Sequence, residues 1–171
     1  MMGGVSDFRS KRFPTAGIDS CGKYVAQNTY WKLYAIENLF RIVIHSVLTV
    51  QHSATWWTGA VDPKIQKRSE NYRQRYSTRP WHTQPGTHDI YYTHLSDLAE
   101  IIRANSHLFE PLVADVDQWI VKIDQILLPR NIVGHMNFPN AVDRQRIDIL
   151  YSDCQVLVGH LRQQNLTLAI P

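Results

Sequence analysis

Three polar side chains, Arg130, Asn131 and His135, interrupt an apolar helical pattern in the C-terminal third of the chain. Apolar residues before them recur every three or four positions, and the same steps would next reach positions 130 and 134. Asn131 and His135 share one face of a helix, and the long side chain of Arg130 can reach a common ligand. Guanidinium groups match phosphate geometry, and imidazoles exchange protons near neutral pH. The pattern therefore indicates a site for anion binding and proton transfer.

Pro129 directly precedes this group. A proline inside a helix removes one backbone donor and crowds the carbonyl of Gln125, so we expect the helix to kink or restart here. After a restart, free backbone N–H groups beside Arg130 would form a small anion site, and Gly134 would let a ligand approach closely. A structural interpretation stays open, because the last turn of a helix commonly carries basic residues that suit its dipole.

The segment RNIVGH, residues 130–135, resembles the R-x4-6-H signature of the HEPN superfamily of helical domains. Its placement is similar too, since the HEPN motif lies near the end of a late, long helix that one further helix follows. The segments YWKLYAIENLFRIVIHSVL and YYTHLSDLAEIIRANSHLF also look like a HEPN branch found in bacterial proteins and at the C-terminus of a eukaryotic nuclear RNA endonuclease. The resemblance covers residues 24–162.

The resemblance implies a metal-independent endoribonuclease that needs no cofactor, acts on RNA as a homodimer and belongs to defence or toxin systems. Arg130 and His135 correspond to the family's catalytic pair, and Asn131 to the polar residue after the arginine. Cleavage through the 2′-hydroxyl requires a base, an acid and cations around the phosphate. One histidine cannot be base and acid at the same instant, whereas a two-fold dimer offers two.

The same resemblance leaves an alternative, because some HEPN domains have lost their activity. Such a domain would bind RNA or a nucleotide, or would serve for protein dimerisation. An antitoxin or another protein partner fits either interpretation. Substitution of His135 separates the two, because only an enzyme has a cleavage activity to lose.

Two further groups of residues fit an RNA site. Glu37 neighbours the apolar stripe of the first helix and is a candidate partner for Arg130, although it equally suits a solvated surface. A basic segment follows Pro63, and four of its cations are candidate RNA contacts: Lys67, Arg68, Arg73 and Arg75. Tyrosines interleave with these cations, as RNA binding would require for phosphates and unstacked bases. A solvated basic helix explains the same residues without a ligand.

Composition narrows the class of protein. The chain has 171 residues, of which 44% are hydrophobic and 19% charged, and its net charge is +3, which permits polyanion binding without demanding it. No His or Cys spacing typical of zinc sites occurs, so we expect no metal ligands. Cys21 and Cys154 make no disulfide framework, and the longest apolar run, LFRIVIHSVLTV, contains Arg41 and His45. We therefore expect a cytoplasmic protein that does not enter a membrane.

Helical spacing predicts the elements that position these residues. Helices are expected over 20–51 and 63–78, from the segment around Leu95, from Pro111 and from a cap at Asn140. Their apolar stripes comprise Leu33, Ile36, Phe40, Val43, Val47 and Val50; Leu95, Leu98, Ile101 and Ile102; Val113, Val116, Ile120, Ile123 and Leu127; and Ile147, Leu150, Cys154, Leu157 and Leu161. Trp56 and Trp57 are expected to attach a loop to the core.

No segment shows the alternation of a strand, so the prediction is an all-α, HEPN-like bundle of about four to five helices. The expected organisation is a flexible N-terminal arm over 1–19, the bundle over 20–165 and a C-terminal tail over 166–171.

Overall fold

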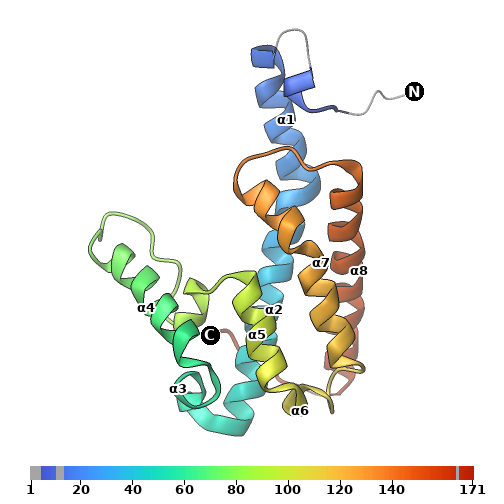
Figure 1. The fold of residues 1–171 in the computed structure, drawn as a ribbon. Coiled ribbons are helices and arrows are strands. Elements are labelled where there is room, and N and C mark those ends of the chain that lie inside the picture. The colour runs from blue at the N-terminus through green and yellow to red at the C-terminus, as the bar shows by residue number, and fades with distance from the viewer. Residues whose placement is uncertain (1–4, 11–13, 165) are drawn as a thin grey trace.

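The computed structural model describes residues 5–10, 14–164 and 166–171, and every regular element in these ranges is helical. The first and longest rod begins with α1 (Ile18–Val25), passes through a π-helical turn (Ala26–Tyr30) and continues as α2 (Trp31–His52). Figure 1 shows this rod extending beyond the rest of the molecule at the end that carries α1. The predicted all-α class is confirmed.

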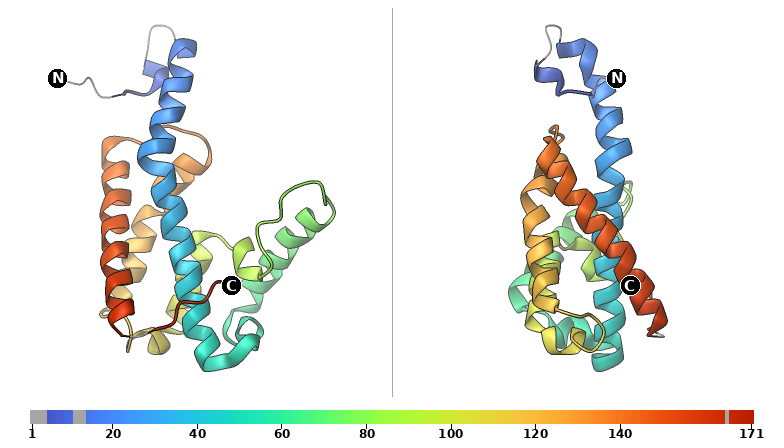
Figure 2. Two further views of the ribbon diagram at one scale, coloured as in Figure 1. Left: turned by 180° about the vertical axis from the view of Figure 1, so that it is seen from behind. Right: turned by 90° about the vertical axis from the view of Figure 1, so that its right-hand side faces the viewer.

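Three further helices complete the bundle: α5 (Leu95–Ala104) and α8 (Ala141–Gln163) pack on α2, and α7 (Val116–Gly134) packs on α5 and α8. In Figure 2, α2, α7 and α8 run along the bundle in the left view, and α8 crosses α2 in the right view. The predicted stripes of α5 and α8 are buried throughout, and that of α2 is buried except for Val50, which is 71% exposed. Burial of these leucine, isoleucine and valine side chains, at about 1.5–3 kcal/mol each, provides the driving force for assembly.

A shift of the buried face of α7 explains why the helix has a polar residue at position 130. The buried positions shift after Ile123 to Ile126, Pro129 and Val133, instead of continuing through 130 and 134. Pro129 lies inside a helix that runs unbroken to Gly134, so of the two alternatives expected, a kink or a restart, the restart and its backbone anion site do not occur. Arg130 therefore lies at the edge of the buried face, where its side chain leaves the core.

Side-chain caps set several helix ends. Asn140 Oδ1 accepts a hydrogen bond of 2.9 Å from the backbone N–H of Asp143, as the sequence predicted. The start of α7 differs from the prediction at Pro111: the helix begins at Val116, and Asp115 caps it with a positive φ of 53°. Pro111 instead lies in a turn that follows the short helix α6 (Ser106–Phe109).

The middle of the chain forms a projecting arm. Short α3 (Trp56–Ala60) turns the chain, and its Trp56 and Trp57 are buried as predicted. Then α4 (Pro63–Ser77) leads away from the bundle. The loop after it, residues 78–88, which we name the proline-rich loop, leads back toward α5 (Figures 1 and 2). Among the described residues, α3 and α6 are additions to the expected four to five helices.

At the termini, the chain forms short 3-10 turns over Phe8–Ser10 and Pro14–Gly17 before α1, within the segment predicted as an arm. The tail returns to the bundle, where the N–H of Ala169 donates to Ser46 Oγ at 2.8 Å. In the described ranges, the helical stretch Ile18–Ala60 alone is long and apolar enough to cross a membrane. Half of its apolar window is buried inside the bundle.

Candidate functional site

Arg130 belongs to a charged triad that joins α7 to α2. Its Nε lies 2.6 Å from Glu37 Oε1, and Arg41 Nη2 lies 3.2 Å from Glu37 Oε2. The pairing of Glu37 with Arg130 that the sequence suggested is therefore present. Arg41 was not among the predicted site residues, although its spacing of four from Glu37, inside an apolar run, was a usable signal.

The charges of this triad are largely shielded from water by burial. The side chains of Glu37 and Arg41 are each 12% exposed, and that of Arg130 is 29% exposed. Burial lowers the pKa of Arg41, and the nearby charge of Arg130 lowers it further, while the Glu37 carboxylate raises it. The Nε of Arg41 is buried without a hydrogen-bond partner among the described residues. One carboxylate thus serves two guanidinium groups, and the triad has a net charge of +1.

The triad faces a cavity of about 410 Å³ between α2, α7 and the proline-rich loop. We name it the Arg130 pocket, and its lining comprises Tyr30, Leu33, Tyr34, Glu37, Asn38, Arg41, Pro85, Tyr91, Arg130, Val133 and Gly134. Three tyrosines thus surround the two arginines. A cationic pocket with aromatic walls suits a phosphate ester joined to a planar group.

Gly134 lies next to the Arg130 guanidinium, one helical turn further along α7. A Cβ at position 134 would lie 3.5 Å from Arg130 Nη1, which is ordinary van der Waals contact. The space beside the guanidinium would therefore accommodate a Cβ, so this contact does not require glycine at position 134.

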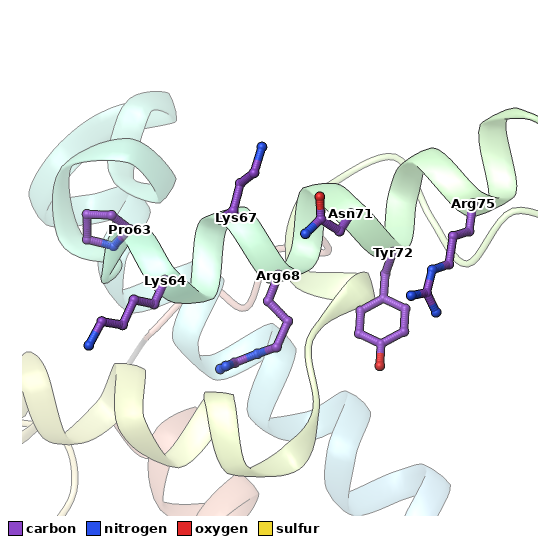
Figure 3. Close-up of a pocket in the computed structure, with 7 residues that line it drawn as sticks. All are labelled: Pro63, Lys64, Lys67, Arg68, Asn71, Tyr72 and Arg75. Carbon is purple, nitrogen blue, oxygen red and sulfur yellow. The ribbon is translucent and has the colours of Figure 1, made fainter.

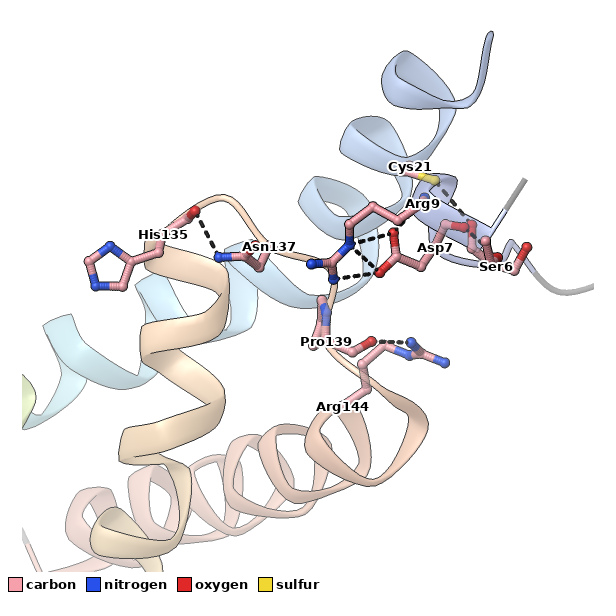
Figure 4. A network of polar contacts seen from close by, with 9 residues as sticks. Ser6, Asp7, Arg9, Cys21, His135, Asn137, Pro139 and Arg144 are labelled. Carbon is pink, nitrogen blue, oxygen red and sulfur yellow. Dashed lines mark hydrogen bonds and ion pairs between the residues drawn. The ribbon is translucent and has the colours of Figure 1, made fainter. Parts of the chain in front are cut away.

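His135 and Asn131 lie outside this pocket. Both residues are exposed, and neither side chain makes a hydrogen bond or ion pair with another described residue. Figure 4 shows the His135 imidazole pointing away from the other residues drawn, while its backbone carbonyl accepts from Asn137 Nδ2 at 3.1 Å. Within one chain the structure therefore brings Arg130 to Glu37 but does not bring His135 to Arg130.

The position of His135 is fixed by the end of α7. The N–H of Met136 donates to the carbonyl of Val133, and the N–H of Asn137 donates to that of Ile132, each at 2.9 Å. This is the Schellman arrangement, and Met136 takes its left-handed position with a φ of 59°. His135 is thus the last residue before the chain reverses.

The turn after His135 is anchored on α1 and α8. The Phe138 ring stacks on Tyr24 at a centroid distance of 5.9 Å, and the Arg144 guanidinium lies 5.5 Å from each ring. Arg144 Nη1 also donates to the Pro139 carbonyl at 2.7 Å (Figure 4). These contacts hold the exposed imidazole on a supported turn.

The four predicted RNA contacts of α4 divide into different roles. Arg68 pairs with the buried Asp97, and Arg73 Nη1 pairs with Asp89 at 2.8 Å, so both hold α4 against the chain that follows it. Lys67 Nζ lies 3.3 Å from Glu70 Oε2 on the exposed surface. The Arg75 guanidinium lies 5.1 Å from the Tyr72 ring centre and has no carboxylate partner among the described residues.

A histidine and tryptophan cluster fixes the far end of the proline-rich loop. The rings of His45 and His88 are 5.3 Å apart, and the His88 ring stacks on Trp56 at 4.9 Å. Trp56 Nε1 donates to His45 Nδ1 at 3.2 Å. In the described part of the chain, no group of three or more His, Cys, Asp or Glu residues is arranged to hold a metal ion.

Comparison with known proteins adds no family assignment: no protein-family model, no curated protein and no solved structure matches this chain.

Proposed function

We propose that this protein is a metal-independent endoribonuclease, active as a homodimer, in which the Arg130 pocket holds an RNA phosphate. The proposal rests on one observation: two guanidinium groups share a single carboxylate at the wall of a cavity of about 410 Å³. A phosphate entering there would supply the negative charge that the triad lacks, through charge-assisted hydrogen bonds. The tyrosines of the pocket offer faces for the adjoining bases.

The proposed reaction needs only the RNA and protein side chains. The 2′-oxygen attacks the adjacent phosphorus as its proton passes to one imidazole, and the bond from phosphorus to the 5′-oxygen breaks as a second imidazole protonates that oxygen. The products are a 2′,3′-cyclic phosphate and a 5′-hydroxyl. His135 is the proposed proton carrier, and Arg130 the proposed stabiliser of the phosphorane. Asn131, exposed one turn before His135, is proposed to contact the same RNA.

In the proposed reaction, a dimer supplies the second imidazole that a single chain lacks. His135 lies outside the Arg130 pocket of its own chain and is exposed on a supported turn. A two-fold arrangement can place the imidazoles of two chains at one phosphate, as the two proton transfers require. The active site proposed is therefore shared between chains.

The first test is cleavage of a mixed single-stranded RNA pool in EDTA. We expect wild type to release products ending in 2′,3′-cyclic phosphate, and His135→Ala and Arg130→Ala to lose at least about 100-fold of the rate. Val121→Ala, at an exposed position of the same helix, is the matched control and retains the rate. Equal cleavage by all four proteins would assign the activity to a contaminant and contradict the proposal.

Mixing wild type with an excess of His135→Ala tests the shared site. A mixed dimer has a single His135 imidazole, whereas the proposed reaction requires two at one phosphate. We therefore expect the cleavage rate to fall as the variant captures wild-type chains. An unchanged rate in a mixture proven to exchange subunits would contradict the shared site.

A second candidate function is a binding module without catalysis. The observation favouring it is that Arg130 is paired with Glu37 while His135 lies apart from both. In that case the wild type binds RNA or a nucleotide at the Arg130 pocket, and Arg130→Ala weakens binding. No cleavage would then be seen in any of the proteins.

A further inference from the structure

A groove runs along α4, away from the Arg130 pocket. A cavity of about 570 Å³ is lined by Pro63, Lys64, Lys67, Arg68, Asn71, Tyr72 and Arg75 (Figure 3). A second cavity of about 380 Å³ is lined by Tyr72, Arg75, Tyr76, Arg79 and His82. The two cavities adjoin, because they share Tyr72 and Arg75, and together we name them the α4 groove.

Helical geometry explains why these residues gather and why Arg73 does not join them. Lys64, Arg68, Asn71 and Arg75 are spaced four, three and four residues apart, so they occupy one face of α4. Figure 3 shows Lys64, Arg68 and Arg75 directed to the same side of the helix. Arg73 lies on another face, where it binds Asp89 and the carbonyl of Thr87.

The α4 groove retains cations that no carboxylate neutralises. Arg68 is engaged with Asp97, but the side chains of Lys64, Arg75 and Arg79 have no acidic partner in the described part of the chain. Such unpaired, exposed cations attract phosphates and gain free energy by releasing counterions from a nucleic acid.

Aromatic rings alternate with these cations. His94 Nε2 lies 3.2 Å from the Tyr72 hydroxyl and holds that ring, while the Arg75 guanidinium covers it. Tyr76 packs against Tyr92, and Trp81 in the following loop is 75% exposed. Only unpaired bases offer faces to such rings, so the groove favours a single strand over a duplex.

The proline-rich loop connects the groove to the Arg130 pocket. His82 lines the groove and Pro85 lines the pocket, and three residues of chain span at most about 11 Å. The helix α4, from Pro63 to Ser77, is about 22 Å long, and the groove runs along it. A strand several nucleotides long therefore has the length needed to reach from the groove to the pocket.

We propose that the α4 groove binds single-stranded RNA, with Lys64 and Arg75 on phosphates and Trp81 stacked on a base, and delivers the strand to the Arg130 pocket. The delivery step rests on the proposed function, whereas binding in the groove does not. The ligand class is a flexible single strand with exposed bases.

The test measures fluorescence anisotropy of a labelled, unstructured 2′-O-methyl RNA, which cannot be cleaved because it has no free 2′-hydroxyl. For Lys64→Gln/Arg75→Gln, we expect weaker binding and a plot of log affinity against log salt that is shallower by about 1.4, at about 0.7 for each lost phosphate contact. Trp81→Ala should weaken binding by about five-fold or more.

The matched control is Lys23→Gln/Arg162→Gln, which removes two exposed cations outside the groove and should leave the salt slope unchanged. Equal slopes for the groove variant and wild type would overturn the proposal. So would equal binding of duplex RNA combined with no effect of Trp81→Ala. Wild type that binds but never cleaves natural RNA would refute the ribonuclease proposal alone.

Discussion

Arg130 and Glu37 are 93 positions apart in the chain, yet Nε of the first lies 2.6 Å from Oε1 of the second. This ion pair ties the end of α7 to the middle of α2. Under the proposed function, a phosphate entering the Arg130 pocket would compete with this carboxylate for the same guanidinium. The ion pair is a structural link, and the proposal also makes it a restraint on anion affinity.

Replacing Glu37 with glutamine should separate these two roles. Without the carboxylate, Arg41 and Arg130 face each other at partial burial, so we expect the free energy of unfolding to fall by about 1–3 kcal/mol in urea titrations. Affinity of the Arg130 pocket for RNA should increase at the same time. Glu100→Gln, at an exposed residue, is the control and should change stability by less than about 0.5 kcal/mol. Reduced affinity for RNA in a folded Glu37→Gln protein would contradict this account.

Gly86→Ala should damage the loop that walls the Arg130 pocket. A Cβ on Gly86 would lie 2.2 Å from Tyr91 Cδ2, so the tyrosine ring must move, at an expected cost of about 1–3 kcal/mol by thermal unfolding. Gly22→Ala meets nothing within 4 Å in helix α1 and should instead stabilise by up to about 1 kcal/mol. If both substitutions had the same sign, the packing of Tyr91 on Gly86 would be wrong.

Met136→Gly should stabilise the turn that carries His135. Met136 has a φ of 59° and is 86% exposed, so its side chain contributes little packing in a conformation that favours glycine. We expect the free energy of unfolding to increase by about 0.5–1 kcal/mol in chemical denaturation. Met136→Val is the comparison variant: because valine is β-branched, we expect this substitution to lower the free energy of unfolding. A loss of stability in the glycine variant would refute the strained turn.

Stability should decrease in mild acid because of two histidines. Burial lowers the pKa of His45 and of His88 below the ordinary 6.5, and the charge of His45 lowers the pKa of His88 further. The unfolded chain therefore binds more protons as the pH falls. Above about pH 6.5 the two neutral rings make their full contribution to the free energy of unfolding. This contribution is lost as the pH decreases toward the pKa values of the folded protein. For each ring, the free energy of unfolding changes by less than about 1.4 kcal/mol per pH unit.

Urea titrations between pH 5 and pH 8 measure this slope. His88→Asn retains an acceptor for the N–H of Ile90, which His88 Nδ1 binds at 3.1 Å, but removes one titrating group. The variant should therefore show a weaker pH dependence than wild type. Identical slopes in the two proteins would show that His88 does not titrate with unfolding.

Local spacing was enough to predict most helices of this protein. The stripes of α5 and α8 and most of that of α2 are buried because residues three and four apart must face the same way on any helix. The cap at Asn140 follows from the same kind of short-range rule, since its side chain needs only the N–H of Asp143. The sequence also identified Arg130 and Glu37 as a candidate pair, because a partly buried cation requires a partner.

Tertiary packing decided what local spacing could not. In the packed protein the buried face of α7 includes Pro129 and Val133, and the helix continues past the proline at which the sequence left a kink and a restart open. Contacts between distant chain segments brought Arg130 to Glu37, assigned Arg68 and Arg73 to carboxylates and left His135 outside the Arg130 pocket. Periodicity specifies which side of a helix is apolar, but the choice among polar partners depends on contacts between residues far apart in sequence.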